Sequence, residues 1–145
     1  MSAPYRIALR TIAVAVTALT LTSCLIFRRP PSAPLAYEHT QASAAGLYRA
    51  TFAPLESIKV GKLHSWKIEV TTADGAPVTD ANITVDGGMP QHGHGLPTKP
   101  VVSQPAGESY EVIEGMKFNM GGWWVVRLRI NGSKGSDVVT FNLKL

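Results

Sequence analysis

A loop with two histidines and one methionine holds the side chains in this sequence that are best suited to binding a metal. Residues 89–97 read Met-Pro-Gln-His-Gly-His-Gly-Leu-Pro. Imidazole and thioether groups are ligands that copper favours. Residues two apart in an extended segment project to the same side, and glycine lets the backbone close further. The spacing predicts a copper site at His92 and His94, with Met89 as a third ligand. The alternative is a structural loop whose imidazoles hydrogen-bond to backbone carbonyls.

Three further side chains are candidate metal ligands from other parts of the chain. Met116 and Met120 flank Lys-Phe-Asn before a Gly-Gly turn, which allows either to lie at the same end of the fold as the histidine loop. Methionine also fills irregular gaps in protein cores, which is the alternative for both. His64 has the strand parity of Trp66 and is expected to point toward the apolar side. It either completes the metal site or caps the core by hydrogen-bonding to a loop.

The sequence contains a single cysteine, Cys24. A chain with one cysteine forms no intramolecular disulfide, no multi-thiolate zinc site and no dithiol redox pair. Any bound metal must therefore use histidine, methionine or carboxylate ligands.

The N-terminus resembles the signal of an exported bacterial lipoprotein. Arg6 and Arg10 precede an apolar run at residues 12–21, which is followed by Thr-Ser-Cys. This pattern predicts a signal peptide at residues 1–23 and a lipid anchor on Cys24. The protein is then expected to be exported and membrane-anchored, facing the periplasm or extracytoplasmic space. The alternative is an uncleaved N-terminal membrane anchor with an incidental cysteine.

Residues 24–45 are expected to form a flexible tether between the lipid and the folded domain. They contain the stretch Arg-Arg-Pro-Pro-Ser-Ala-Pro at residues 28–34 and continue without a sustained apolar period. Prolines remove backbone donors and bias the chain toward extended forms. The two arginines are expected to meet anionic head groups. His39 lies in this tether and is expected to be solvated.

The charge distribution argues against nucleic acid as a partner. The whole chain has a formal net charge of +4, but four of its arginines lie before the expected domain. From Gly46 onward, ten Lys or Arg stand against nine Asp or Glu, interspersed without a stripe. A domain that binds nucleic acid is expected to carry a basic patch or stripe. The membrane, reached through the lipid anchor, is therefore the expected partner of the basic N-terminus.

The pattern of residues 46–145 predicts an all-β domain. Segments 63–71 and 124–130 each place apolar residues on one face by alternation, and turn signals such as Asp74-Gly75 and Asn131-Gly132 separate segments of this kind. No comparable helical stripe appears in this region. These features predict an antiparallel β-sandwich of about seven strands.

Several short motifs follow one another in a distinctive order across the same region. They are Gly46-Leu47-Tyr48, His64-Ser65-Trp66, residues 74–81, the histidine loop at 89–95, Tyr110, residues 116–120, Gly122-Trp123-Trp124, Asp137 and Phe141. This order resembles the YtkA-like or FixH-like domain of exported bacterial proteins. The resemblance implies an immunoglobulin-like β-sandwich, an association with membranes, and a loose link to copper handling and oxidase assembly. Gln91 departs from the methionine-rich copper loops of the broader group, where a further methionine would favour Cu(I).

No catalytic motif is present in the sequence, so we assign no catalytic residue and expect no enzyme activity. The nucleophile elbow, the Walker phosphate loop, the dinucleotide glycine fingerprint and the zinc-protease helix are all missing. Two functions remain. The first is a lipoprotein domain that binds copper and exchanges it with a copper-handling partner. The second is an assembly or scaffold module that contacts a membrane protein complex, with outward-facing Trp123 beside inward-facing Trp124 as a contact residue.

Overall fold

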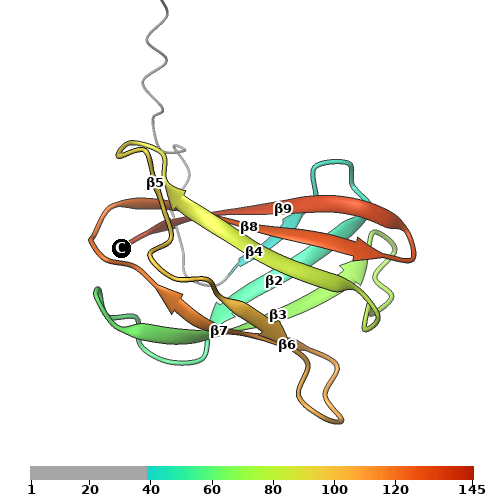
Figure 1. Cartoon of the computed structure of the whole chain (residues 1–145). Helices are drawn as coiled ribbons and strands as arrows, with labels where there is room; N and C mark the ends of the chain where they lie inside the picture. Colours follow the sequence, from blue (N-terminus) through green and yellow to red (C-terminus); the bar gives the residue numbers. More distant parts are fainter. Residues whose placement is uncertain (1–38) are drawn as a thin grey trace, which may run out of the picture.

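The domain consists of two antiparallel β-sheets packed face to face (Figure 1). The computed structural model describes residues 39–145. Sheet A has five strands in the order β1-β2-β3-β7-β6, and sheet B has four in the order β5-β4-β8-β9. The strands are β1 (His39–Ala42), β2 (Tyr48–Pro54), β3 (Leu63–Thr72), β4 (Asn82–Met89), β5 (His94–Gly95), β6 (Val101–Ser103), β7 (Glu111–Lys117), β8 (Trp123–Gly132) and β9 (Gly135–Lys144).

The prediction of an all-β sandwich is confirmed, and the described residues contain nine strands where the sequence predicted about seven. The two additional strands are β1 and β5. Strand β1 has the sequence His-Thr-Gln-Ala and is mostly exposed, so it shows no apolar alternation. It is held instead by pairing with residues 49–52 of β2. Strand β5 contains only two residues, too few for any pattern.

The first described residues, from His39, already form strand β1, which lies before the predicted domain boundary at Gly46. His39 pairs with Phe52, and its ring centroid lies 4.9 Å from that of Phe141. The prediction that His39 belongs to a solvated tether was therefore wrong, because backbone pairing with β2 incorporates this polar segment into sheet A. The rest of the predicted tether, residues 24–38, lies outside the described residues.

Aromatic rings dominate the core between the two sheets. Phe52 stacks on Trp66 with ring centroids 4.2 Å apart, and Phe118 meets Trp124 edge-on at 5.1 Å. All four side chains are completely buried. Alternation along β2, β3 and β8 sends Phe52, Trp66 and Trp124 to the inner face, and Phe118 joins them directly after the end of β7. The large apolar area of these rings is thereby removed from water.

The carboxylate of Asp137 on β9 ties the β1–β2 turn to sheet B. It accepts hydrogen bonds from the backbone N–H groups of Ala45, Leu47 and Val138, at 2.8 to 3.3 Å. Burial alone raises the pKa of this carboxyl, but the hydrogen bonds from Ser43 and from these three N–H groups outweigh it and lower the pKa to about 2. Asp137 therefore holds the start of the domain in place as an ionised acceptor.

The candidate residues gather at one end of the sandwich, which we call the loop end. It contains the β2–β3 loop (55–62), the β4–β5 turn (90–93) and the β7–β8 loop (118–122). It lies at the left of Figure 1, near the label of the C-terminus. Strand β1 runs away from this end, because it is antiparallel to β2 with His39 opposite Phe52.

Candidate functional site

The histidine loop forms a hairpin between β4 and β5. Met89, the last residue of β4, is directly opposite His94 in the antiparallel pair. The carbonyl oxygen of Met89 accepts hydrogen bonds from the N–H groups of His92 and Gly93, both at 3.0 Å. Gly93 has φ of 71°, a left-handed conformation that glycine adopts without strain. The turn is therefore closed by backbone bonds, and its two imidazoles project from a fixed frame.

The two imidazole rings lie side by side. Their centroids are 5.9 Å apart, the angle between their planes is 28°, and both residues are exposed. We predicted from the spacing that one extended segment carries both histidines on the same side. In the structure, His92 lies in the turn and only His94 lies on a strand. The turn, rather than strand periodicity, brings the rings together.

Met89 shares a face of sheet B with His94, since directly opposed residues of an antiparallel pair point to the same side. Its side chain is nevertheless only 1% exposed. Gly122 marks where the side chain ends, because a Cβ added there would lie 2.8 Å from the terminal methyl of Met89. The thioether thus lies in the core behind the histidines, toward the β7–β8 loop.

Trp124 connects the hairpin to the β7–β8 loop. Its ring meets that of His94 edge-on at 6.1 Å, and its indole N–H donates to the carbonyl oxygen of Met120 at 3.0 Å. Met120 is 37% exposed. The structure therefore places an accessible thioether residue at the same end as the two imidazoles, as the sequence predicted. The contact with Trp124 was not anticipated, because strand alternation only assigned this residue to the core.

His64 and Met116 lie apart from the hairpin. They face one another across β3 and β7 of sheet A, and Met116 is completely buried. Two aromatic rings separate His64 from His94: the ring of His64 contacts Phe118, Phe118 contacts Trp124, and Trp124 contacts His94. Of the two predicted roles for His64, the geometry therefore matches the cap on the core.

The Nε2 atom of His64 is engaged by the β2–β3 loop. It lies 2.9 Å from the backbone nitrogen of Lys59 and 3.0 Å from the carbonyl oxygen of the same residue. Whether Nε2 accepts from this N–H group or donates to this carbonyl, the backbone of Lys59 holds the ring against the loop. Met116, opposite His64, is buried in the core, which matches the core-filling role that was the alternative to metal binding.

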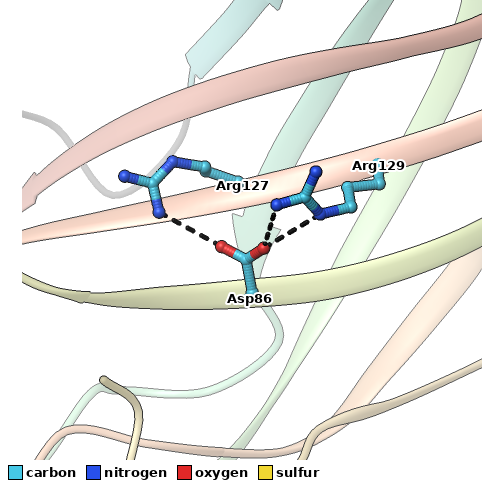
Figure 2. A network of polar contacts seen from close by, with 3 residues as sticks. All are labelled: Asp86, Arg127 and Arg129. Atoms are coloured by element: carbon cyan, nitrogen blue, oxygen red, sulfur yellow. Dashed lines mark hydrogen bonds and ion pairs between the residues drawn. The ribbon is translucent and has the colours of Figure 1, made fainter. Parts of the chain in front are cut away.

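A shallow hollow of about 250 Å³ opens beside the hairpin. Its lining comes mainly from the glycine-rich backbone of β4 and the turn, together with His94 and Arg127. Figure 2 shows that Arg127 and Arg129, on β8, hold the carboxylate of Asp86 between them. The Arg127 contact with Asp86 is 3.1 Å long, and the shorter Arg129 contact is 2.9 Å. Asp86 and Arg127 were not predicted as neighbours of the site.

Within residues 39–145, no three His, Cys, Asp or Glu side chains are grouped so as to hold a metal ion. His92 and His94 therefore form a pair, to which a third ligand would come from a thioether or from outside the domain. Trp123 faces outward from β8, as expected, and its indole N–H donates to the side-chain oxygen of Asn142 at 2.9 Å. Its role in contacting a partner stays a prediction.

The predicted signal peptide at residues 1–23 and the lipidation site Cys24 lie outside the described residues. In the part of the chain that the structure describes, no helix meets the length and hydropathy needed to span a membrane.

Comparisons with known proteins give one family and one solved structure. A sequence model described as YtkA-like matches residues 38–129. The solved structure is a "ZirS C-terminal Domain", which aligns over 100% of this chain and 99% of its own with 11% sequence identity and a TM-score of 0.37. No curated protein matches the chain.

Proposed function

The chain belongs to the YtkA-like family, and we propose that its domain is a non-enzymatic, exported and membrane-anchored module that binds copper through His92 and His94. The observation that carries this proposal is the pair of exposed imidazole rings 5.9 Å apart on one closed turn. A metal–nitrogen bond of about 2.0–2.1 Å puts each ring centroid about 3 Å from the ion, so rings that share an ion have centroids up to about 6 Å apart. The 5.9 Å separation of the two centroids lies within this limit.

The ligand types favour copper over harder cations. Imidazole binds both Cu(I) and Cu(II), while thioether sulfur favours Cu(I). Met120 supplies the accessible thioether at the loop end, and Met89 lies directly behind His94. When bound, copper would be held by the two imidazoles of this domain with a coordination position open to Met120 or to a ligand from a partner. An open position suits the exchange of copper with a copper-handling partner.

Titration of the purified metal-free chain with Cu(I) and Cu(II) tests the proposal. We expect His92→Ala and His94→Ala each to weaken binding at least tenfold, and the double variant to abolish it. His39→Gln is the control, because His39 is far from the histidine hairpin. Strand β1 contacts β9, which forms one edge of sheet B, while β5 forms the other edge. Unchanged affinity in the folded double variant would contradict the proposal. A loss of folding in His94→Ala, seen by circular dichroism, would instead support the structural-loop alternative.

The membrane anchor is a separate part of the proposal and has a separate test. The run of apolar residues followed by Thr-Ser-Cys at residues 22–24 supports lipidation at Cys24. We expect Cys24→Ser to release the protein from the membrane fraction. Retention of this variant in membranes would favour the uncleaved N-terminal anchor.

A second candidate function is an assembly module that contacts a membrane protein complex through the outer face of sheet B. This face presents Trp123 and Arg127, and tryptophan and arginine are enriched in protein interfaces. Trp123→Ala discriminates between the two functions. Loss of co-purification of a membrane protein with unchanged copper affinity would support the assembly module.

A further inference from the structure

Three large apolar side chains are exposed together on the β2–β3 loop and its border with β3. Leu55, Val60 and Leu63 are 54%, 49% and 63% exposed. They fall within nine consecutive residues of one loop segment, 55–63. Singly exposed apolar residues are common, but a cluster on one loop marks a surface that another apolar phase covers.

Lysines surround these apolar side chains. Lys59 and Lys62 lie within the same segment and are exposed, and Lys117 on β7 is directly opposite Leu63. The acidic residue of the segment, Glu56, accepts a hydrogen bond from the backbone N–H of Ser65 at 2.6 Å. Its carboxylate is therefore directed back toward the protein, and the tip of the segment presents apolar and positive groups.

The fold converts a nearly neutral domain into one with charged poles. Residues 39–145 contain ten Lys or Arg and nine Asp or Glu, which appear evenly mixed along the sequence. The loop end carries four lysines against one glutamate: Lys59, Lys62, Lys117, Lys144 and Glu56. The opposite end carries four acidic residues against two basic ones: Asp74, Asp80, Glu108, Asp137, Arg49 and Lys134. The positive pole therefore coincides with the exposed apolar cluster.

Strand β1 runs away from this same pole. Strand β1 begins at His39, which is paired with Phe52, three residues before Leu55. Strand β1 is antiparallel to β2, so its first described residue lies on the side that faces the loop end.

We propose that segment 55–63 docks onto an anionic bilayer, inserting Leu55, Val60 and Leu63 at the interface while Lys59, Lys62 and Lys117 meet the head groups. This docking deepens only the membrane part of the proposed function and does not depend on copper. Apolar insertion and lysine attraction act together in interfacial binding, with each lysine near an anionic surface strengthening binding about fivefold. Docking orients the domain, so that the β4–β5 hairpin at the same pole faces the membrane side.

Hydrogen exchange of the full chain tests the docking with vesicles of phosphatidylglycerol or of phosphatidylcholine. An anchor places the protein on both kinds of vesicle, so a difference between them reports on the domain itself. We expect the amides of residues 55–63 to exchange at least fivefold more slowly on phosphatidylglycerol than on phosphatidylcholine. The β3–β4 turn around Asp74-Gly75, at the acidic pole, serves as the internal reference and is expected not to change.

Variants separate insertion from charge. The triple variant Leu55→Ser/Val60→Ser/Leu63→Ser and the double variant Lys59→Glu/Lys62→Glu are each expected to remove the protection. All five residues are exposed, which favours retention of the fold, and the exchange of the core strands verifies it. Val101→Ser is the matched control, because Val101 is 62% exposed but lies on β6, away from this segment.

Equal exchange of residues 55–63 on the two lipids would overturn the proposal, as would equal loss of protection in Val101→Ser. The measurement is made with copper removed and repeated with His92→Ala/His94→Ala. Protection that survives in this variant supports docking even where copper binding fails, so the two proposals are tested independently.

Discussion

At the scale of single residues, the placement of the histidines depends on backbone hydrogen bonds more than on side-chain chemistry. The carbonyl of Met89 fixes the turn that carries His92, while pairing with Met89 fixes His94. His64 shows the opposite outcome for the same residue type, because its ring is engaged by the backbone of Lys59 inside the protein. The residue types identify the candidate ligands. The hydrogen bonds of the surrounding backbone decide which of these side chains face solvent.

Asp137 provides a prediction at this scale. Removing its carboxylate leaves the N–H groups of Ala45 and Leu47 without their acceptor. We expect Asp137→Ala to lower the free energy of unfolding by about 2 kcal/mol. Asp137→Asn, which keeps one acceptor oxygen, is expected to lose less. Urea unfolding followed by tryptophan fluorescence measures both, and an unchanged midpoint for Asp137→Ala would show that the clamp is unimportant.

The same carboxylate predicts a pH dependence. The pKa of Asp137 is about 2 in the folded chain, below its ordinary value of 3.8. Because the folded state favours the ionised form, the contribution is fully present above the ordinary pKa and is lost as pH falls toward the folded value. We expect the stability difference between the parent chain and Asp137→Asn to shrink from about pH 4 to about pH 2. A difference that stays constant over this interval would assign the effect to shape rather than charge.

At the scale of elements, the β4–β5 hairpin depends on the close approach of two backbones. A Cβ on Gly88 would collide with the carbonyl oxygen of His94 and lie 2.9 Å from the Cα of Gly95. A Cβ on Gly95 would meet only the carbonyl oxygen of Gly87, at an ordinary 3.4 Å. Glycine at position 88 is therefore required by packing, while glycine at position 95 is replaceable.

This difference predicts opposite outcomes for two similar substitutions. We expect Gly88→Ala to displace β5, to cost about 2 kcal/mol in stability and to weaken copper binding. Gly95→Ala is expected to preserve both properties. Calorimetric titration with copper, combined with hydrogen exchange of residues 90–96, measures the effect. Equal copper affinities in the two variants would show that the hairpin geometry does not control the site.

The strands that the sequence predicts are those with buried alternating residues. Trp66, Ile68 and Val70 occupy the inner face of β3 as expected, since period-two burial is visible in the residues themselves. Strand β1 lacks that signal, because a mostly polar edge strand is held by backbone pairing with β2. The pairing of Met89 with His94 also has no signal in the sequence. It depends on the geometry of the turn and on the space at Gly88.

At the scale of the whole molecule, the fold brings together groups that are dispersed in the sequence. The β2–β3 loop, the β4–β5 turn and the β7–β8 loop meet at the loop end. An even mixture of charges along the chain likewise becomes a positive pole and an acidic pole. Neither arrangement is visible from spacing alone, because both depend on which ends of antiparallel strands coincide.

The central claim is that the imidazoles of His92 and His94 share one copper ion. X-ray absorption spectroscopy of the copper-loaded chain tests it most directly, because the scattering of imidazole rings and of sulfur is distinguishable. We expect two imidazoles at about 2.0 Å from copper, with a sulfur ligand in the Cu(I) form, and loss of both imidazoles in His92→Ala/His94→Ala. Copper that shows no imidazole scattering, or the same scattering in the double variant, would contradict the account.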